Sequence, residues 1–356
     1  ALDGEKAEYK YSYNYQSWYP SAEYETHNTL KNVGLFDLTP FSKFEIKSDK
    51  AHQELQKICT ANIKKDAGKC TYTHMLNSDG GIEADLTVVS VDENHFRIIS
   101  SAATRERDKH HIKKHLNKDI ELEDVTDDYC VFGLFGPKSR DLMNSLSNDN
   151  FSNENFRFGT AKFISIEDTK IWTQRLSYVG ELGYELFVEV KDAKKIYELI
   201  VKKGKDFNLS NCGMHAMDIM RMESGFLHWG HDISPEENQY QAGLSFTISN
   251  KKNVDFIGKR ALEKIDKKKI KTRFAMFTLK DSKPGEPLLL HDEPIYLKDQ
   301  IIGKSTSGNY SFNFKKNLTF GYIKNDFSNE KLKGSKLFIE VEKKKYEIEL
   351  INKPLK

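Results

Sequence analysis

The sequence predicts an α+β fold that ends in a small all-β barrel or sandwich. Three observations support this prediction. The chain has 356 residues, which is more than one compact unit usually holds, so we expect two or three closely packed lobes. Up to about residue 250, segments with helical apolar spacing and segments with strand-like alternation follow one another. From about Arg273 the pattern changes to short strands separated by turns.

The first part of the chain carries both kinds of element. Residues 1–20 are rich in tyrosine and are expected to pack across a neighbouring lobe rather than to fold alone. Residues 33–37 (VGLFD) are predicted to form a turn after the first helix. A second turn, Asp79-Gly80-Gly81, predicts a hairpin, because glycine adopts positive φ angles without steric cost. The expected helices are residues 23–32, 51–59, 104–116, 138–146, 193–203 and 214–226, and the expected strands are residues 41–46, 71–76, 83–90, 95–100, 129–135, 161–166, 170–177 and 185–190.

The last part of the chain is expected to be a separate β unit. Residues 251–271 are the expected junction between this unit and the part before it. The expected strands are residues 274–279, 294–297, 303–310, 318–323, 336–341 and 346–351.

Charge and composition exclude several classes of partner. Lys and Arg number 55 and Asp and Glu number 53, a net charge of +2. A protein whose main task is to cover nucleic acid normally has a larger and more clustered cationic excess, so we expect no nucleic-acid partner. No apolar run reaches the length of a membrane span, and residues 1–13 are polar and aromatic rather than signal-like. Four cysteines without CxxC spacing suit a reducing compartment. We therefore expect a cytoplasmic protein with no membrane partner.

Several common catalytic motifs are absent from the sequence. There is no GxGxxG after a strand, no Walker loop, no HExxH and no GxSxG. The missing dinucleotide fingerprint argues against a flavin or nicotinamide site in this chain. We therefore expect the purified protein to be colourless and to hold neither FAD nor NAD. An absorption spectrum that showed stoichiometric flavin would contradict this expectation.

The histidines do not predict a metal site. His110, His111 and His115 lie on one charged helix, where a solvated helix face is the expected interpretation because no carboxylate or cysteine partner has a recognisable spacing. His228 and His231 lie just after another helix, where they either line a pocket or take part in ordinary packing.

Two acidic residues on predicted strands are candidate functional groups. Asp85, in CTYTHMLNSDGGIEADLTV, shares a strand face with Glu83 and Thr87. It is either a part-buried acid–base group or an exposed carboxylate of an edge strand. Glu185, in SYVGELGYELFV, follows Tyr178 and a glycine-bounded turn. It is either a carboxylate suited to two hydrogen bonds from a planar amino-pyrimidine edge or part of a surface hairpin.

A series of phrases along the chain resembles the aminomethyltransferase (glycine-cleavage T-protein) family. More narrowly, they are similar to the folate-binding C-terminal region of dimethylglycine and sarcosine dehydrogenases. The resemblance covers nearly the whole chain, from about Trp18 to Ile351. In order, the phrases are VGLFDLTPFSKFEIK, YTHMLNSDGGIEADLTV, GLFGPKSRDLM, SYVGELGYELFV, MRMESGFLHWGHDI, QAGLSF, DFIGKRAL and GKSTSGNYSFNFKKNLTFGYI.

The resemblance implies a three-lobed fold around a central hole that holds tetrahydrofolate. Residues 1–250 would form an aminomethyltransferase-type region of two interleaved α+β lobes, the second at about 50–128, and residues 270–356 a C-terminal β-barrel domain. Asp85 would be the catalytic residue that orients N10 of the folate and assists proton movement. The implied folate-binding residues are Tyr72, Thr87, Tyr178, Glu185, Arg221 and Trp229.

The implied activity is tetrahydrofolate-dependent transfer of a methylene or methyl group from a small methylated amine or related donor. Two departures separate the chain from glycine-cleavage T-proteins: Ala84 stands where they usually have a second Asp, and His228-Trp229-Gly230 replaces a phrase that ends in Tyr-Gly. A chain without a flavin lobe would receive activated carbon from a separate flavoprotein dehydrogenase. Two alternatives are a direct demethylase of a sulfonium, betaine or methoxy compound, and a non-catalytic folate-binding subunit of a flavoprotein complex.

Overall fold

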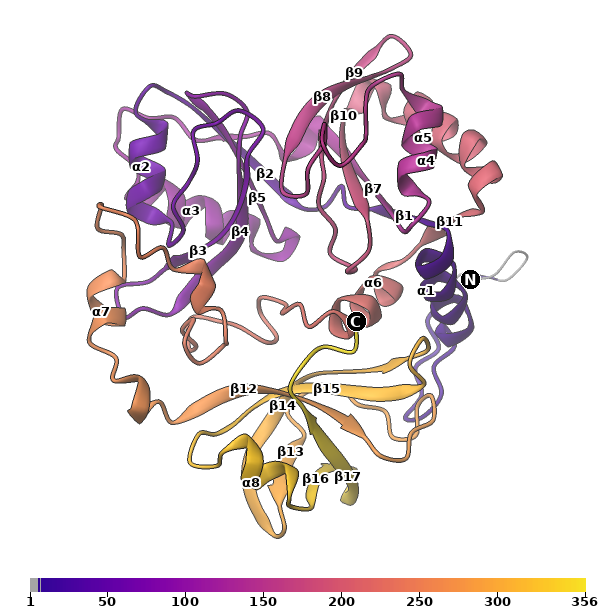
Figure 1. Cartoon of the computed structure of the whole chain (residues 1–356), viewed down its shortest axis with the longest axis vertical. Coiled ribbons are helices and arrows are strands. Elements are labelled where there is room, and N and C mark those ends of the chain that lie inside the picture. Colours follow the sequence, from indigo (N-terminus) through magenta and orange to yellow (C-terminus); the bar gives the residue numbers. More distant parts are fainter. Residues whose placement is uncertain (1–5, 7) are drawn as a thin grey trace.

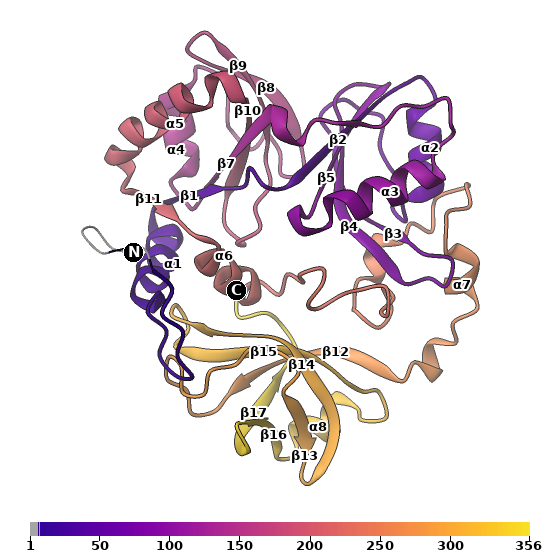
Figure 2. The ribbon, with the colours of Figure 1, turned by 180° about the vertical axis from the view of Figure 1, so that it is seen from behind.

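Three sheets, each in its own lobe, surround a common centre in the computed structural model of the chain (Figure 1). The structure describes residue 6 and residues 8–356. The view from behind shows the same arrangement and places the C-terminal end beside helix α6 (Figure 2), where the Lys356 amide donates to the Glu223 carbonyl at 3.0 Å.

The first lobe is built on a six-stranded sheet with the order β11-β1-β7-β10-β9-β8. Strand β1 pairs with β11 in parallel and with β7 antiparallel. Helices α4 and α5 pack against each other beside this sheet, and α6 packs against α1. The bounds are α1 Tyr19–Lys31, β1 Val33–Asp37, β7 Tyr129–Phe135, α4 Ser139–Leu146, β8 Ala161–Ile166, β9 Thr169–Gln174, β10 Gly183–Glu189, α5 Val190–Gly204, β11 Leu209–Cys212 and α6 Met214–Glu223.

Residues 33–37 form strand β1, so the turn predicted there is wrong. The glycine and aspartate of VGLFD are typical of a turn in local sequence. Residues 33–37 are extended instead, because β1 pairs with β11 on one side and β7 on the other and Val33 to Phe36 are buried. Gly34 also permits close packing, since a Cβ atom there would lie 2.3 Å from Thr29 Oγ1.

The second lobe is formed by the residues between β1 and β7, so the chain leaves the first lobe and returns to it. Its five-stranded sheet has the order β3-β4-β5-β2-β6. Apolar residues of this sheet and of helices α2 and α3 form one core, which includes Phe44, Leu55, Val88 and Ile112. The bounds are β2 Ser42–Lys47, α2 Ala51–Ile58, β3 Cys70–Leu76, β4 Ile82–Ser90, β5 His95–Ser100, α3 Arg105–His115 and β6 Glu123–Asp124.

The third lobe is a closed six-stranded barrel with the order β12-β15-β14-β13-β16-β17. The connection that leads to it runs along the second lobe, where the amides of Ser249 and Ile257 donate to the carbonyls of Thr60 and Lys57 at 3.1 and 3.0 Å. The bounds are α7 Lys259–Glu263, β12 Thr272–Leu279, β13 Pro294–Leu297, β14 Gln300–Ser311, β15 Lys316–Lys324, α8 Asn329–Lys333, β16 Leu337–Val341 and β17 Lys344–Ile351. The predicted α+β fold with a C-terminal β unit is confirmed, and that unit is a barrel.

The tyrosine-rich segment before α1 is partly described. Trp18 stacks on His215 of α6 with 4.7 Å between ring centroids, while Tyr11 and Tyr13 are each 83% exposed. Residues 1–5 and 7 of the predicted packing segment lie outside the described residues.

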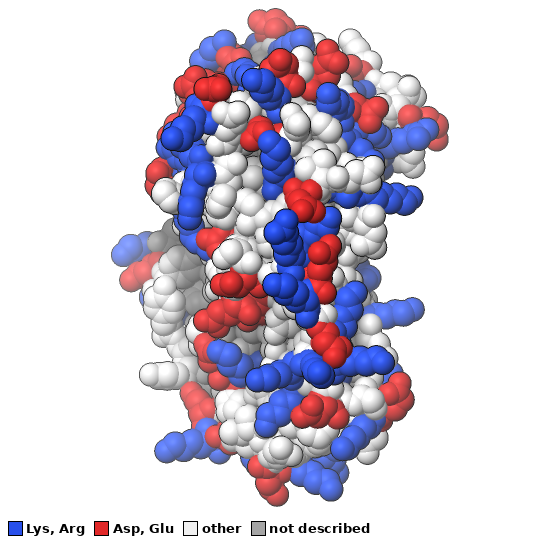
Figure 3. Space-filling model, turned by 90° about the vertical axis from the view of Figure 1, so that its left-hand side faces the viewer, with Lys and Arg blue, Asp and Glu red and all other residues white. Residues whose placement is uncertain are grey.

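The surface carries charges of both signs. On the side drawn in Figure 3, which is that of the second lobe and the barrel, Lys and Arg alternate with Asp and Glu. Within residue 6 and residues 8–356, no helix has the length and apolar character that a bilayer crossing needs. The four cysteines are free thiols.

Candidate functional site

The β3–β4 hairpin brings four polar side chains together on one face. Strand register places Tyr72 opposite Thr87 and His74 opposite Asp85. Alternation then puts all four on the same side of the sheet. The other side of β4, which carries Leu86 and further apolar residues, faces the core of the second lobe.

Asp85 occupies a largely enclosed position on this face. Its side chain is 16% exposed, and its Oδ1 atom has no hydrogen-bond partner among the described residues. His74 Nε2 lies 3.6 Å from this oxygen. Burial raises the pKa of Asp85 from 3.8 to about 7, and the nearby Tyr72 hydroxyl opposes the rise. Strand β4 lies between β3 and β5, so Asp85 is not the exposed edge-strand carboxylate of the alternative interpretation.

His74 is a site residue that the sequence analysis did not select. Its ring is completely buried, and burial lowers its pKa to about 3, so the imidazole is neutral. Nδ1 lies 3.0 Å from Thr247 Oγ1, and Nε2 lies 3.2 Å from the Tyr72 hydroxyl. His74 therefore holds the Tyr72 hydroxyl beside Asp85. Its position two residues after Tyr72 on an alternating strand is the signal that could have found it.

Exposed aromatic rings flank the Asp85 face. Tyr72 is 41% exposed and Phe246 is 74% exposed, and their ring centroids lie 6.4 Å apart. Desolvation nevertheless raises the pKa of the Tyr72 hydroxyl well above 10. The ring of Tyr72 is therefore accessible, while protein atoms including Asp85 and His74 crowd its hydroxyl.

Glu185 and Tyr178 provide a second group of polar atoms. Burial raises the pKa of the Glu185 carboxyl to about 7, and this carboxylate has no hydrogen bond within the described chain. The Tyr178 hydroxyl donates to the Leu227 carbonyl at 2.7 Å, and its ring stacks on Phe226 with a centroid distance of 5.8 Å. Strand β10 pairs with both β7 and β9, so Glu185 does not belong to a surface hairpin.

Gln174 is a further residue that the sequence analysis missed. It lies on β9 directly opposite Glu185 and is fully buried. Neither its amide oxygen nor its amide nitrogen has a partner among the described residues. Buried polar groups without partners are rare in native proteins and call for an explanation. Gln174 and Glu185 together form a polar edge without protein partners.

Electrostatic coupling connects these groups across the centre. The charge of Asp85 contributes to the raised pKa values of both Tyr72 and Tyr178, in each case after desolvation. The charge of Glu185 contributes in the same way, after burial, to the raised pKa of the Cys70 thiol at the start of β3. Asp85 of the second lobe and Glu185 of the first lobe therefore each lie close to a residue of the other lobe.

Arg221 does not face this space freely, because protein acceptors use its guanidinium. Nε donates to Asp218 Oδ1 at 2.8 Å, Nη1 to Asp232 Oδ2 at 2.6 Å and Nη2 to Ser307 Oγ at 2.8 Å. The residue is 2% exposed. In this structure Arg221 joins α6 to the barrel, and its predicted contact with folate stays a prediction.

Trp229 lies in the loop of residues 224–233, which we call the central loop. Its Nε1 donates to the Ile82 carbonyl at 3.0 Å, and the Arg107 guanidinium lies 4.4 Å from the ring centroid. Arg107 also donates to the carbonyl and the carboxylate of Glu83. Trp229 thus fixes the central loop to β4 of the second lobe, three residues before Asp85.

One of the three histidines of α3 differs from the predicted solvated face, while His110 is exposed as expected. His111 is 8% exposed, and burial lowers its pKa to about 4, so it is not part of a solvated face. In the described part of the chain no three His, Cys, Asp or Glu side chains converge as a metal site.

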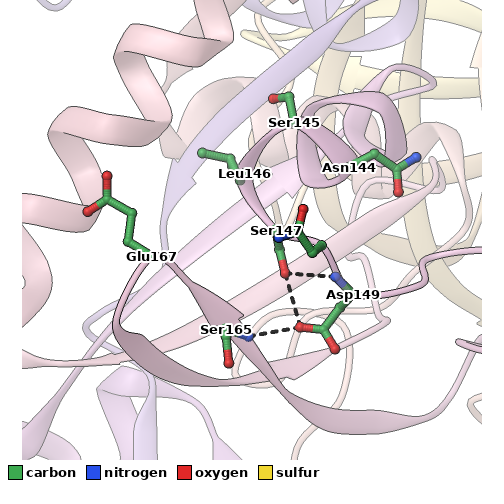
Figure 4. Close-up of a pocket in the computed structure, with 8 residues that line it drawn as sticks. Asn144, Ser145, Leu146, Ser147, Asp149, Ser165 and Glu167 are labelled. Atoms are coloured by element: carbon green, nitrogen blue, oxygen red, sulfur yellow. Dashed lines mark hydrogen bonds between the residues drawn. The ribbon is translucent and has the colours of Figure 1, made fainter.

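A recess on the first lobe is distinct from the site. It is lined by residues of α4, of the loop that follows α4, of β8 and of the turn between β8 and β9 (Figure 4). Asp149 Oδ2 accepts hydrogen bonds from the Ser147 hydroxyl at 3.0 Å and from the Ser165 amide at 2.9 Å. Neighbouring residues therefore supply hydrogen bonds to the Asp149 carboxylate, and none of the predicted site residues lines this recess.

Comparison with known proteins identifies two conserved modules. The family model described as the GCVT N-terminal domain matches residues 1–252, and that of the glycine cleavage T-protein C-terminal barrel domain matches residues 273–356. The structure of the glycine cleavage system aminomethyltransferase T from Bartonella henselae superimposes with a TM-score of 0.84 at 19% identity, covering 98% of this chain and 94% of that one. This likeness shows the fold.

Curated relatives include both short and long proteins. An aminomethyltransferase of Halothermothrix orenii is 31% identical over 307 residues, which are 85% of this chain and 83% of the relative. The mitochondrial dimethylglycine dehydrogenase of Rattus norvegicus is 32% identical over 356 residues, or 99% of this chain and 41% of the relative. The 4-methylaminobutanoate oxidase (formaldehyde-forming) of Paenarthrobacter nicotinovorans is 35% identical over 86% of this chain and 37% of the relative. The chain thus spans less than half the length of these two longer relatives.

Proposed function

Because the chain belongs to the aminomethyltransferase (glycine cleavage T-protein) family, we propose that it is a tetrahydrofolate-dependent one-carbon transferase. It moves a methylene or methyl group from a small methylated amine or related donor to tetrahydrofolate. The observation that carries this proposal is a pair of desolvated carboxyl groups, Asp85 and Glu185. Asp85 lies beside the exposed ring of Tyr72, and its Oδ1 atom has no hydrogen-bond partner among the described residues. Tetrahydrofolate carries N–H groups that can donate hydrogen bonds to these carboxyl groups.

The Glu185 side of the site fits the pterin ring. An ionised carboxylate accepts two in-plane hydrogen bonds from an amino group and a ring N–H, and charge-assisted bonds of this kind are strong. Gln174, opposite Glu185 on β9, can add one donor and one acceptor once local packing adjusts around the ligand. Tyr178 supplies an aromatic face whose hydroxyl is already fixed by Leu227.

The Asp85 side of the site fits the acid–base chemistry of the transfer. A carboxyl group with a pKa of about 7 is present in both protonation states at neutral pH, so it can accept a proton from a folate nitrogen and return it. His74 and Tyr72 fix the geometry around Asp85 without competing for the proton, because the imidazole is neutral and the pKa of the phenol is raised.

The donor is proposed from the longer relatives. The similarity to dimethylglycine dehydrogenase extends over 99% of this chain, and another relative is a formaldehyde-forming oxidase of a methylamine. These names support a methylated amine as the donor. A separate flavoprotein dehydrogenase that oxidises this amine would be a partner of this module.

One assay tests the proposal directly. The protein is incubated with tetrahydrofolate and a panel of methylamines, betaines, sulfoniums and methoxy compounds, and the folate products are followed by mass spectrometry. In the reverse direction it is incubated with 5,10-methylenetetrahydrofolate and secondary amines, and amine-dependent formation of tetrahydrofolate is measured. A product of the first assay identifies direct demethylation, whereas activity in the second alone indicates methylene transfer. Failure of tetrahydrofolate to bind in calorimetry would exclude the proposal.

Replacing Glu185 with Ala should weaken tetrahydrofolate binding by about 1.5–3 kcal/mol, the range for a lost charge-assisted hydrogen bond. The wild-type affinity should also depend on pH. The raised pKa of Glu185, about 7, means that the free carboxyl is mostly protonated below pH 7 and must lose this proton to accept N–H bonds. The affinity should therefore fall by up to about tenfold per pH unit below 7. Calorimetry from pH 5.5 to 8.5 measures both effects.

The matched control is Glu189→Gln, because Glu189 is an exposed residue of the same strand. Its affinity and pH dependence should equal those of the wild type. Unchanged folate affinity in Glu185→Ala would remove Glu185 from the pterin site.

A further inference from the structure

The central loop is fixed to the first and second lobes on either side of His228. Immediately before His228, the Leu227 carbonyl accepts from the Tyr178 hydroxyl of the first lobe at 2.7 Å. Immediately after it, Trp229 Nε1 donates to the Ile82 carbonyl of the second lobe at 3.0 Å. The backbone of His228 is therefore held between the two lobes that carry the site.

The same loop is fixed to the barrel through Asp232. The His228 amide donates to Asp232 Oδ2 at 3.0 Å. Asp232 Oδ1 accepts from Thr306 Oγ1 at 2.6 Å and from Ser307 Oγ at 2.8 Å, both on β14. All three lobes thus determine where His228 lies. A surface side chain without a function does not need a backbone that is fixed by three lobes.

The imidazole of His228 is accessible and has no hydrogen-bond partner among the described residues. It belongs to the exposed residues, and its ring nitrogens make no hydrogen bond within the described chain. Desolvation nevertheless lowers its pKa below 6.5, because protein atoms crowd part of the ring. The charged and titratable groups around it are Arg221 and Asp218 on α6 and His231 and Asp232 on its own loop. The result is an accessible imidazole that is mainly neutral at pH 7 and lies near Arg221 and Asp218 of α6.

The proposed reaction moves two protons. When an iminium, R₂N⁺=CH₂, gives its methylene group to tetrahydrofolate, both bonding pairs of the C=N bond go to the amine nitrogen, and the carbon forms one bond to N5 and one to N10. The two protons of N5 and N10 end on the amine, which leaves as R₂NH₂⁺, so charge and electrons balance. Asp85 can carry one proton at a time, and the second requires another group or a second cycle of Asp85.

The other titratable groups of the site are poorly suited to this task. His74 is a weak base, because burial lowers its pKa to about 3. Glu185 is assigned to the pterin edge. The Asp218 carboxylate already accepts from Arg221 Nε at 2.8 Å and from Asn309 Nδ2 at 2.9 Å. His228 combines a neutral imidazole with a free lone pair.

We infer that His228 is the second proton-transfer residue of the site and acts on the nitrogen of the carbon donor. Asp85 serves the folate nitrogens, and His228 serves the departing amine on the side of the central loop. This inference rests on the proposed function, since it assumes methylene transfer between an amine and tetrahydrofolate.

The test uses the reverse assay with 5,10-methylenetetrahydrofolate and secondary amines in single turnover. Replacement of His228 by Ala should lower the rate by about 10²-fold or more, as expected for a positioned acid–base group, with tetrahydrofolate affinity within about threefold and an unchanged melting temperature. Added imidazole should restore part of the lost rate, because it can occupy the space that the side chain leaves. A purely structural residue would not show this rescue.

The control is His231→Ala, a change of the neighbouring exposed histidine whose ring lies 4.7 Å from His228. It should react at the wild-type rate, with no effect of imidazole. A His228→Ala protein that reacts like the wild type would overturn the inference. The inference would also be overturned if both His228→Ala and His228→Gln lost rate, folate affinity and melting temperature together and imidazole restored none of the rate. A wild-type protein that neither binds tetrahydrofolate nor forms product would overturn the proposed function instead.

Discussion

Replacement of Asp85 by Asn should lower the single-turnover rate of carbon transfer by about 10²–10⁴-fold, the usual effect of losing a positioned acid–base group. Folate affinity should stay within a few-fold, because the pterin ring is assigned to Glu185 and Tyr178. The melting temperature above pH 7 should equal or exceed that of the wild type. Burial raises the pKa of Asp85 from 3.8 to about 7, so its ionised form destabilises the folded state as the pH rises through this range. Asn removes that penalty.

Three measurements on one preparation separate a catalytic Asp85 from a structural one: melting temperature, folate affinity and transfer rate. A structural Asp85 would support the hairpin turn, and its loss would lower all three together. The geometry favours catalysis, because Asn77 Oδ1 accepts from the amides of Asp79 and Gly81 at 3.0 and 2.9 Å and so holds the turn itself. The matched control is Asp79→Asn, in the exposed turn of the same hairpin, which should behave as the wild type.

The same variant decides between an enzyme and a passive folate-binding subunit. If Asp85→Asn binds folate and transfers carbon at the wild-type rate, Asp85 has no chemical role and the non-catalytic alternative gains support. If binding persists while transfer is lost, the protein is a transferase.

Replacement of Arg221 by Met should lower the free energy of unfolding by about 3–5 kcal/mol, the cost of removing one member of a buried ion pair. The side chain of Asp232 is 0% exposed and loses its Nη1 donor, while Ser307 loses its Nη2 donor. Four contacts of Arg221 would be broken at once, counting the one to Asp218 within α6 and the one to the Phe226 carbonyl of the central loop. Urea denaturation followed by circular dichroism measures the effect.

Two further variants test the reason for this loss. Arg221→Met combined with Asp232→Asn should recover part of the stability, because no uncompensated buried charge remains. Lys304→Ala, which breaks an exposed ion pair with Asp292, should change stability by no more than about 1 kcal/mol. Additive losses in the double variant would show that charge compensation is not what Arg221 provides.

Much of the fold could be predicted from local sequence. Strict alternation in residues 82–88 correctly separated Asp85 and Thr87 from Leu86 and Val88, because one face of a strand must meet the core. The ordered phrases correctly identified the aminomethyltransferase family, since their order reflects one fold. The strand β11 was missed, because its sequence LSNC lacks apolar alternation and the strand exists through parallel pairing with β1.

The sequence by itself determined the α+β class, the C-terminal β unit and the strand face of Asp85, because these depend on periodicity within one segment. The tertiary structure alone decided which residue stands beside Asp85. Counting back from the turn pairs Leu76 with Ile82 and would place Thr73 opposite Asp85. A bulge at Glu83 shifts the register by one, so that Met75 pairs with Ala84 and His74 with Asp85. Arg107, from a helix more than twenty residues away, binds the Glu83 carbonyl at 2.6 Å, a contact between distant segments that no local pattern contains.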